Sequence, residues 1–199
     1  MRILIATRNR HKLGEIRAIL NQPDIEWVDL SAFPGAPAVE EDLPTFEGNA
    51  VKKAVELARF SGLWTLADDS GLEVDALGGD PGVRSARYAG EPADDAANNR
   101  KLLAALDGHT DRAACFRCVV ALTHPEGSCR WVEGRCEGHI VDAPRGAGGF
   151  GYDPLFIPRG FTQTYAELSP AVKNRISHRA RALQRAADEL LPWYKLQTA

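Results

Sequence analysis

The sequence predicts an α/β domain built on a mixed β-sheet, and three observations lead to this class. The chain has 199 residues, which is enough for one domain with a substantial hydrophobic core. Short apolar runs alternate with segments of helical periodicity in the order β-α-β-α-β, as is typical of α/β folds. A helix, a hairpin of two strand-like segments and a further helical region follow, so the sheet should be mixed.

The composition narrows the class of protein. Apolar residues make up 44% and charged residues 26%, as in ordinary globular proteins, and the formal net charge is only −3. Such a charge gives no overall attraction to nucleic acid or to a membrane surface. No apolar run approaches the roughly 18 residues of a membrane span, and the N-terminal apolar segment is too short for a signal peptide. We therefore expect a cytoplasmic protein that binds neither nucleic acid nor membranes.

The N-terminal part begins with a strand, a turn and a helix. Residues 2–6 form a short apolar run that predicts a buried strand, and residues 11–20 carry apolar side chains at helical spacing. The polar residues 7–12 therefore span the turn between them. Residues 25–30 predict a second strand, and residues 31–44 predict a loop because they are rich in Pro and Gly.

A second helix and a third strand follow this loop. Thr45 is a good N-cap for a helix over residues 46–60, and Gly62 is placed to end that helix. Residues 64–67 predict a strand. We expect this strand to stop in a turn at residues 68–71, whose sequence is Asp-Asp-Ser-Gly, because these residue types favour turns.

The middle of the chain predicts three strands and a helix. Residues 71–77 alternate in polarity like a half-exposed strand, and a loop with one helical turn follows. Residues 94–108 predict a helix that ends in Gly. Residues 112–123 and 128–141 predict the two strands of a hairpin.

The C-terminal part predicts a loop, a short strand and helices. Residues 144–154 are rich in glycine, and residues 155–157 predict a strand. Ser169 is an N-cap with Pro at the first helical position, and it opens a helical segment that reaches residue 191. Ser177 offers a break in this segment, because it could cap a second helix.

The four cysteines predict buried, reduced thiols. Cys115 and Cys118 have the spacing of half a zinc site, but they lie in a predicted strand, where residues three apart point to opposite faces. Cys129 and Cys136 also differ by an odd number, so four thiolates would not converge on one zinc ion.

The first strand-to-helix turn is a candidate phosphate site. Backbone N–H groups and the positive end of a helix favour an anion at such a position. The turn adds the side chains of Thr7, Arg8, Asn9, Arg10, His11 and Lys12. The turn lacks the glycines of a Walker loop. The alternative interpretation is a solvated turn in which Asn9 merely caps the helix.

Asp68 and Asp69 are candidate metal-binding or catalytic carboxylates. No basic residue adjoins them in the sequence, so we expect the compensating positive charge to come from a metal ion. Their side chains should point in different directions and have different roles. Glu40 and Glu41 lie in a loop that could approach the same site, and such oxygen ligands suit Mg²⁺. The alternatives are an Asx-turn for the aspartates and a solvated loop for the glutamates.

The glycine-rich loop is a candidate base pocket. Its glycines would let the backbone approach a ligand closely. Phe150 or Tyr152 could stack on a base, and Asp153 could accept a hydrogen bond from a ring N–H. The alternative is a tight turn with an aromatic side chain packed inward.

The C-terminal helical segment carries potential hydrogen-bond donors. Lys173 and Ser177 are four residues apart and would share a helix face, so Lys173 could reach a phosphate. His178 and Arg179 could donate to the carbonyl edge of a purine. The alternative is a basic, solvated helix face. Taken together, these four features predict an enzyme that binds a nucleoside triphosphate with Mg²⁺.

Longer motifs add a family resemblance. The chain reads IATRNRHKLGEI near its start, then EEDLPTFEGNAVKKA and ADDSGLEVDALGGDPGVRSARYAG, and later GGFGYDPLF and ELSPAVKNRISHRARAL. With these motifs it resembles, nearly end to end, the inosine/xanthosine triphosphate pyrophosphatases. The resemblance implies Mg²⁺-dependent hydrolysis of ITP, dITP and XTP to a nucleoside monophosphate and pyrophosphate, which cleanses the nucleotide pool. It also implies one elongated, two-lobed α/β domain over residues 1–199, with the active site in the cleft between lobes, and a homodimer.

The resemblance also assigns roles to residues. Residues 7–12 would hold the triphosphate, and Lys173 would reach a phosphate. Glu41 and Asp69 would bind Mg²⁺, with Asp69 as the proton acceptor for the attacking water and Asp68 in support. The remaining substrate contacts would come from Ser70, from the base-pocket residues Phe150, Gly151, Tyr152 and Asp153, and from His178 and Arg179, which would read the base.

Two positions depart from the family pattern. Many relatives have Gly where this chain has Arg8, which could add a phosphate contact. Many also have Glu where this chain has Gly48, so Glu40 or Glu47 would have to supply the missing carboxylate.

Selectivity would depend on the purine 6-position. A carbonyl there accepts a hydrogen bond from a donor such as Arg179, whereas the amino group of adenine does not. Rejection of guanine must involve the 2-position. A pyrophosphatase acting on dTTP or UTP, and a nucleotide- or RNA-binding module without catalysis, are the alternative functions.

Overall fold

The computed structural model describes residues 2–198, and these residues form two compact units. The chain passes between the units inside three of its strands, at residues 69, 117 and 134, and once more after residue 178. Unit 1 contains residues 2–69, 118–134 and 179–198 of the described chain, and unit 2 contains Ser70–Arg117 and Arg135–His178.

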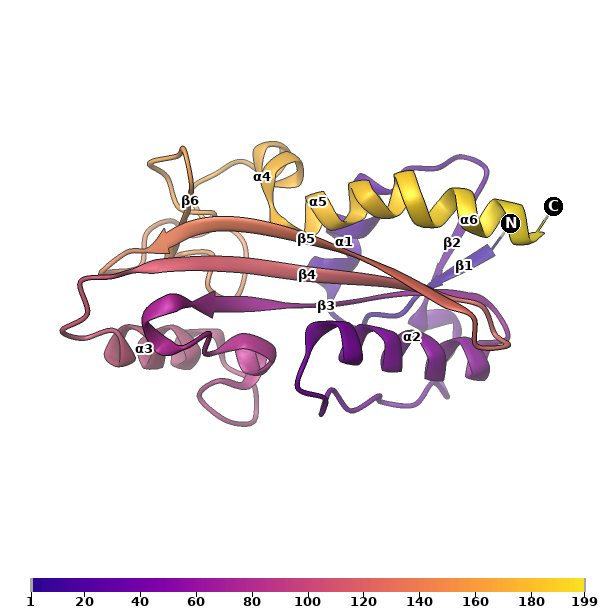
Figure 1. Cartoon of the computed structure of the whole chain (residues 1–199), viewed down its shortest axis with the longest axis horizontal. Helices are drawn as coiled ribbons and strands as arrows, with labels where there is room; N and C mark the ends of the chain where they lie inside the picture. Colours follow the sequence, from indigo (N-terminus) through magenta and orange to yellow (C-terminus); the bar gives the residue numbers. More distant parts are fainter. Residues whose placement is uncertain (1, 199) are drawn as a thin grey trace. The chain divides into compact units, whose positions relative to one another are not determined.

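Six strands and six α-helices make up most of the regular structure (Figure 1). The strands are β1 (Arg2–Ile5), β2 (Glu26–Asp29), β3 (Trp64–Val74), β4 (Ala113–Thr123), β5 (Cys129–Ile140) and β6 (Phe156–Pro158). The helices are α1 (Arg10–Ile19), α2 (Phe46–Ser61), α3 (Asp95–Ala105), α4 (Pro170–Ile176), α5 (His178–Arg185) and α6 (Leu191–Thr198). A π-helical segment, Ala186–Leu190, joins α5 to α6.

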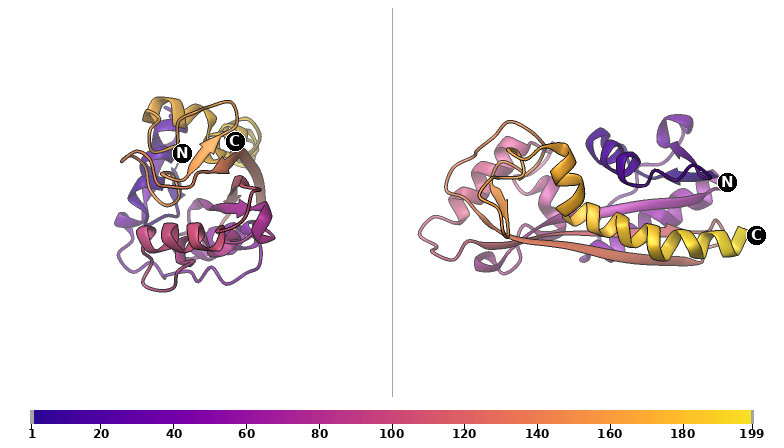
Figure 2. Two further views of the ribbon diagram at one scale, coloured as in Figure 1. Left: turned by 90° about the vertical axis from the view of Figure 1, so that its left-hand side faces the viewer. Right: turned by 90° about the horizontal axis from the view of Figure 1, so that it is seen from above.

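The strands form one mixed sheet in the order β2-β1-β3-β4-β5-β6. Strand β1 pairs in parallel with both β2 and β3, with Ile3 opposite Trp27 and Trp64. Strands β5 and β6 are antiparallel. The long strands β4 and β5 are neighbours in this sheet, and they run side by side in Figure 1 and in the right-hand view of Figure 2. The predicted α/β class with a mixed sheet is confirmed.

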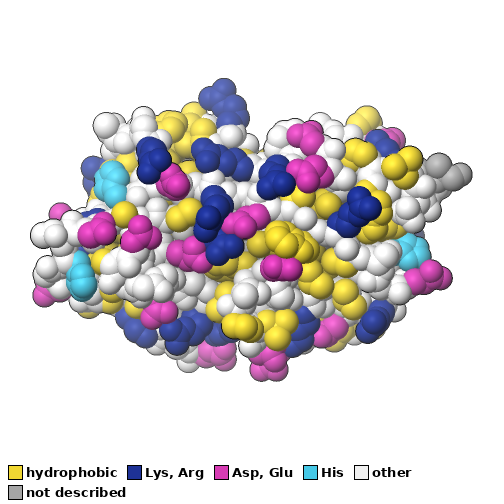
Figure 3. Space-filling model, viewed as in Figure 1, with side chains coloured by type: hydrophobic (Ala, Val, Ile, Leu, Met, Phe, Trp, Pro, Cys, Tyr) yellow, Lys and Arg dark blue, Asp and Glu magenta, His cyan; other side chains and the backbone are white. Residues whose placement is uncertain are grey.

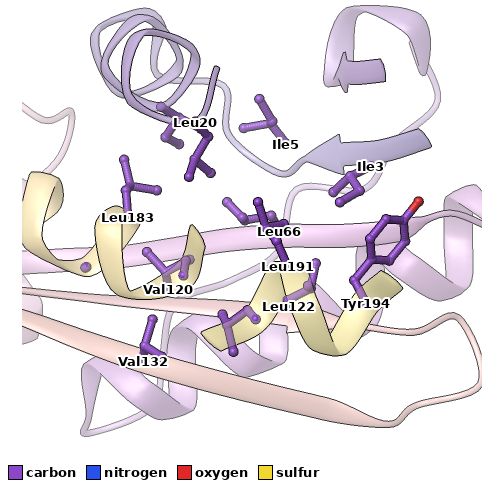
Figure 4. Close-up of a cluster of buried hydrophobic side chains, with 14 of the residues drawn as sticks. Ile3, Ile5, Leu20, Leu66, Val120, Leu122, Val132, Leu183, Leu191 and Tyr194 are labelled. Carbon is purple, nitrogen blue, oxygen red and sulfur yellow. The ribbon is translucent and has the colours of Figure 1, made fainter. Parts of the chain in front are cut away.

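The core of unit 1 lies between the sheet and the helices α1, α5 and α6. Ile3, Ile5 and Leu66 belong to this core, and Figure 4 shows them with side chains from the helices. Leu4 and Ala67 are also buried but lie outside this cluster, because successive residues of a strand point to opposite faces. Helix α2 lies on the other side of β3 from α1, α5 and α6 (Figure 1), so it covers this second face.

Unit 2 has its own core, which is rich in aromatic side chains. It combines apolar residues of β3, β4, β5, β6 and α3 with those of the loop before β6. The rings of Phe116 and Phe156 meet edge to face, with centroids 4.8 Å apart. Such pairs contribute about 0.5–1.5 kcal/mol beyond the area that they bury.

The helix ends follow the predicted signals. Thr45 caps α2 by accepting a hydrogen bond from the N–H of Gly48, and Gly62 ends the helix in the left-handed conformation. Ser169 caps α4 with Pro170 at the first position. The predicted break at Ser177 is also confirmed, because α4 ends there and α5 begins at His178.

The predicted turn at residues 68–71 is wrong. Strand β3 continues without interruption from Trp64 to Val74, and both aspartates lie inside it. The turn propensity of Asp, Ser and Gly is weak compared with tertiary contacts. Here both carboxylates have polar partners on the two faces of the strand, as described below, and β3 runs on through them.

The surface shows no segregation of charge on the face drawn in Figure 3, where Lys and Arg lie among Asp and Glu. Within residues 2–198, no helix combines the length and apolarity that crossing a bilayer requires.

Candidate functional site

The two adjacent aspartates of β3 point to opposite faces of the strand. Asp68 has the same parity as Leu66, which faces α1 and α5, and Asp69 has the parity of Ala67, which faces α2. Both side chains are buried, with Asp68 1% and Asp69 5% exposed. The expectation that they point in different directions is therefore confirmed.

Asp68 is neutralised by two cations from helices far away in the sequence. Its Oδ2 atom lies 3.1 Å from Lys12 Nζ on α1 and 3.3 Å from Arg179 Nε on α5. Burial raises the pKa of Asp68, but the nearby charges of Lys12, Arg179 and Lys53 outweigh burial and hold the pKa well below its usual range. Our expectation that the compensating charge comes from a metal ion is wrong for Asp68, because Lys12 and Arg179 supply it from positions far away in the sequence.

Arg179 is itself buried, with only 1% of its surface exposed. Besides Asp68, its guanidinium binds Glu15 of α1, with 2.5 Å between Nη1 and Oε2. Lys12 and Arg179 carry two positive charges, and Asp68 and Glu15 carry two negative ones. This arrangement satisfies the general requirement that buried charges be paired.

Asp69 has the opposite electrostatic environment. Burial and the negative charge of Glu41 raise the pKa of Asp69 to about 6, although Lys12, Lys53 and a hydrogen bond from Asn49 act against this rise. Lys53 Nζ binds the carboxylate of Glu41 directly. The Asp69 carboxyl is therefore charged for most of the time at pH 7, as a general base must be.

The loop that carries Glu41 is held by helix α2. Asn49 accepts a hydrogen bond from the N–H of Leu43 (2.9 Å) and donates one to its carbonyl (3.2 Å). These two bonds fix the backbone two residues after Glu41. The buried side chain of Asn49 thus organises the acidic site, by which we mean the carboxylates of Glu41 and Asp69. The sequence predicted helix α2 but did not single out Asn49.

The acidic site fits a metal ion that is completed by substrate. Within residues 2–198, no group of three or more His, Cys, Asp and Glu side chains is arranged to hold a metal. Glu41 and Asp69 nevertheless repel each other in a buried environment, and a divalent cation would relieve this repulsion. Mg²⁺ commonly binds through one or two carboxylates, with water and phosphate oxygens as its other ligands. The two residues present therefore suit Mg²⁺ better than a fully protein-enclosed metal.

Gly48, one of the two departures from the family pattern, lies where a side chain would be crowded by its neighbours. A Cβ atom at this position would lie 3.1 Å from Leu43 Cδ1 and 3.1 Å from Thr45 Oγ1. Glu40 and Glu47, the two suggested substitutes for a missing carboxylate, are both exposed.

In the turn before α1, Asn9 caps the helix, as the alternative interpretation of this segment expected. The Asn9 side chain accepts hydrogen bonds from the backbone N–H groups of His11 (2.9 Å) and Lys12 (3.2 Å). Arg8 donates to the carbonyl of Ala36 (2.6 Å). Arg8, Asn9, Arg10 and His11 are exposed, while Lys12 turns inward to Asp68.

In unit 2, the glycine-rich loop is built around Asp153. One carboxylate oxygen accepts hydrogen bonds from the backbone N–H of Phe150 (2.9 Å) and from Lys173 Nζ (2.6 Å). The same ammonium group lies 4.8 Å from the centre of the Phe150 ring. A Cβ atom at Gly149 would lie 2.0 Å from Asp153 Oδ2, so only glycine fits this close approach. The loop thus brings Phe150, Asp153 and Lys173 together.

Two predicted base-pocket residues lie inside the core of unit 2. Tyr152 is 3% exposed and donates a hydrogen bond from its hydroxyl to the carbonyl of Ser85 (2.9 Å). His178 is 4% exposed, and its ring stacks on Phe116 with centroids 4.6 Å apart. Ser70, at the start of unit 2, is partly exposed.

Helix α3 makes a contact with the loop that the sequence analysis missed. The N–H of Gly151 donates to Asp95 Oδ2 (2.7 Å), and the Gly151 carbonyl accepts from Asn99 Nδ2 (3.0 Å). The i,i+4 spacing of two polar residues on the predicted helix was a signal for a shared face.

The four cysteines are thiols, as predicted. Cys118 and Cys136 are buried, and Cys115 and Cys129 are partly buried. Burial raises the pKa of Cys118 to about 12, and the charge of Asp68 adds to this effect. This thiol is therefore protonated at neutral pH and acts as a small apolar side chain.

Comparisons with known proteins agree on one family. The model of the Ham1 family matches residues 3–189. The dITP/XTP pyrophosphatase of Desulforamulus reducens is 51% identical over 192 residues, which cover 96% of this chain and 96% of that protein. The dITP/XTP pyrophosphatase of Geobacter sulfurreducens is 52% identical over 191 residues, which cover 95% and 96%, respectively.

Solved structures show the same fold. A HAM1 protein from Coxiella burnetii superposes with a TM-score of 0.89 at 41% identity, over 96% of this chain and 99% of that chain. A nucleoside-triphosphatase / dITP/XTP pyrophosphatase from Mycobacterium abscessus gives a TM-score of 0.77 at 47% identity, over 93% and 97%. The family that the motifs indicated is confirmed, and the chain belongs to the Ham1 family.

Proposed function

We propose that the protein is a nucleoside triphosphate pyrophosphatase that hydrolyses dITP, ITP and XTP to the nucleoside monophosphate and pyrophosphate. The observation that carries this proposal is the buried carboxylate of Asp69 beside the half-buried carboxylate of Glu41, with the charges of Lys12 and Lys53 nearby. It occurs in a chain about half identical to dITP/XTP pyrophosphatases over nearly its full length. Such an enzyme would remove non-canonical purine nucleotides from the nucleotide pool.

Glu41 and Asp69 would hold Mg²⁺. When bound, the ion would neutralise the negative charge of the phosphates and help to orient them. The mutual repulsion of the two carboxylates in the metal-free protein supports this assignment, because it makes cation binding favourable. Lys53 already compensates Glu41 in part and would remain near the phosphates as a further positive charge.

Asp69 would accept the proton of the attacking water. A general base must be ionised at the working pH and still basic enough to accept a proton, so its pKa must not be held far below that pH. Asp69 meets this requirement, whereas Asp68 is committed to Lys12 and Arg179. Asp68 would therefore act through Lys12, by fixing the ammonium group close to Asp69.

The phosphates would be bound by the turn over residues 7–12. Lys12 is the member of this turn whose charge acts on both aspartates. Asn9 would shape the turn through its cap, and the partly exposed Thr7 and the exposed Arg8, Arg10 and His11 would add contacts. Arg8, which replaces the glycine of many relatives, would be one of these. Ser70 would touch the substrate, and Lys173 would reach a phosphate.

The base would be bound by the loop of unit 2. Phe150 is partly exposed and would stack on the purine, and Gly151 would let the backbone approach it. Asp153 would accept from a ring N–H, and Tyr152 would support the loop from inside the core. His178 and Arg179 would read the 6-carbonyl, with the guanidinium fixed by Asp68 and Glu15.

Assembly and location belong to the same proposal. We propose a homodimer, as the family resemblance implies, that works in the cytoplasm on free nucleotides.

The proposal is tested by the products and the substrate profile. Pyrophosphate and orthophosphate should be measured with ITP, dITP, XTP, GTP, ATP, dTTP and UTP, each in Mg²⁺ and in EDTA. We expect pyrophosphate from ITP, dITP and XTP at least about 10²-fold faster than from GTP and ATP, a gap of about 2.7 kcal/mol, and only with Mg²⁺. Fast cleavage of dTTP or UTP would indicate a pyrophosphatase of another specificity. Binding without cleavage would indicate a nucleotide-binding module.

A further inference from the structure

Helix α3 holds one residue of the glycine-rich loop, Gly151, from two sides. Asp95 accepts from the N–H of Gly151 at 2.7 Å, and Asn99 donates to the carbonyl of the same residue at 3.0 Å. The two side chains are four residues apart, so they stand on the same face of the helix. Both backbone polar groups of Gly151 are thus bound by one rigid element.

The contact fixes an unusual backbone conformation. Gly151 has φ = 60°, in the left-handed region where glycine is the favoured residue. Glycine is also the most flexible residue, so a loop that depends on it needs external contacts to stay in one conformation. Asp95 and Asn99 provide two such contacts at this glycine.

Phe150 and Asp153 flank the held residue. Phe150 precedes Gly151, and its N–H donates to the carboxylate of Asp153 at 2.9 Å. Lys173 joins the same carboxylate at 2.6 Å. A change in the Gly151 backbone would therefore move the aromatic ring and the carboxylate that the proposed function assigns to the base.

Packing alone does not account for Asn99. Its side chain is 9% exposed, and its Oδ1 atom accepts no hydrogen bond from any group within residues 2–198. A buried amide oxygen without a donor is unfavourable, and an apolar side chain of similar size would avoid this cost. The neighbouring Asn98 has a separate task, because it accepts from the N–H of Ala89 and donates to the carbonyl of Ala86.

We propose that Asp95 and Asn99 are positioning residues that hold Gly151 and thereby place Phe150 and Asp153 for recognition of the purine base. This inference rests on the proposed function and deepens it, because it names residues on which base selection depends. Neither side chain needs to contact the substrate for this role.

The contacts of Asp95 and Asn99 with Gly151, which we call the clamp, can be tested without substrate. Amide hydrogen exchange of the loop peptide should be measured in the wild type, Asp95→Ala and Asn99→Leu. We expect exchange of the Gly151 amide to be at least about tenfold faster in both variants, because its acceptor or its carbonyl partner is lost. Arg100→Ala is the matched control, since Arg100 lies on the same helix beside Asn99 with an exposed side chain. Unchanged exchange in Asp95→Ala and Asn99→Leu would overturn the clamp.

Its role in base selection is tested by kinetics with dITP and dGTP. We expect Asp95→Ala and Asn99→Leu to raise KM for dITP about tenfold with kcat within about threefold, and to reduce the dITP/dGTP preference about tenfold. Asp95→Asn keeps an acceptor for the Gly151 amide and should restore most of the preference. Arg100→Ala should keep the wild-type KM and preference.

Failure of the proposed function and failure of the role of Asp95 and Asn99 would give different results. Wild-type kinetics in both clamp variants, or the same shift in Arg100→Ala, would overturn the role in base selection while leaving the proposed function intact. A wild type that cleaves no triphosphate would contradict the proposed function, and with it the role in base selection. The exchange rates would still decide whether the clamp exists.

Discussion

Asp68 and Asp69 are neighbours in the sequence, yet nearby cations stabilise the charged form of Asp68, whereas burial and the negative charge of Glu41 destabilise the charged form of Asp69. The alternation of a β-strand separates them, since one side chain meets α1 and α5 and the other meets α2. The same substitution at the two positions should therefore change stability in opposite directions.

Asp68→Asn should destabilise the protein strongly. It would leave the buried cations Lys12 and Arg179 with one carboxylate fewer, and such losses cost about 3–5 kcal/mol of unfolding free energy. The pKa of Asp68 is lowered in the folded state, so its contribution is complete above the unfolded pKa of about 3.9 and is lost as the pH falls. Urea unfolding at pH 7.5 checks the first effect, and a decreasing difference from the wild type below pH 4 checks the second.

The control for this prediction is Asp42→Asn, which removes an exposed ion pair with Lys52. Exposed pairs contribute about 0–1 kcal/mol, so this variant should be close to the wild type. If Asp68→Asn were equally mild, the buried ion pairs would not stabilise the fold as described.

Asp69→Asn should stabilise the metal-free protein. The folded pKa of about 6 lies above the unfolded value, so the folded state binds the proton more tightly. The contribution of Asp69 to stability is then greatest below pH 4 and falls as the pH rises to 6, by an amount on the order of 2–3 kcal/mol. The variant lacks this loss, and urea unfolding in EDTA at pH 4 and pH 7.5 should show a gain only at the higher pH.

Metal addition provides a second measurement on the same pair of proteins. If Glu41 and Asp69 hold Mg²⁺, millimolar Mg²⁺ should raise the melting temperature of the wild type more than that of Asp69→Asn, because the ion binds the folded state. Equal shifts in both proteins would argue against Asp69 as a ligand.

At the scale of elements, the sequence signals were most informative where they are local. Thr45, Gly62 and Ser169 cap or end their helices as predicted, since caps depend on residues a few positions apart. The prediction that a turn interrupts the strand at residues 68–71 was wrong, because the partners of the two carboxylates come from three helices and a loop. Periodicity located the strand and α3, but it could not show that Asn99 meets Gly151 or that Arg179 meets Asp68.

Two glycines in helices predict opposite effects of one substitution. Gly14 lies inside α1 with open space where a Cβ would be, so Gly14→Ala should stabilise the protein by about 0.5–1 kcal/mol. Gly62 ends α2 with φ = 67°, where alanine is strained, so Gly62→Ala should destabilise it by about 1 kcal/mol. Chemical denaturation of both variants checks the pair. Equal effects of the same sign would contradict the assigned helix ends.

At the scale of the whole molecule, strands β3, β4 and β5 each contribute to both units. We expect the chain to unfold as a single cooperative domain, because neither unit can keep these strands when the other unfolds. All four tryptophans, Trp27, Trp64, Trp131 and Trp193, belong to unit 1, so their fluorescence reports on that unit. Fluorescence and far-ultraviolet circular dichroism should give coincident urea transitions. Two separate transitions would show that the units fold independently.

The function depends on chemistry that only the folded chain assembles. The sequence motifs predicted the family and the acidic residues, whereas the assignment of Asp69 rather than Asp68 as the base also depends on the burial and charge around each carboxylate. Replacing Asp69 should therefore remove activity without a loss of stability, whereas replacing Asp68 should reduce stability.

The most direct test is the rate of pyrophosphate release from dITP by Asp69→Asn, measured in Mg²⁺ beside the wild type and Asp42→Asn. We predict that Asp69→Asn loses at least about 10³-fold in kcat while remaining folded and at least as stable as the wild type in EDTA, and that Asp42→Asn keeps full activity. An Asp69→Asn protein that releases pyrophosphate at a rate near that of the wild type would contradict the assignment of Asp69 as the catalytic base.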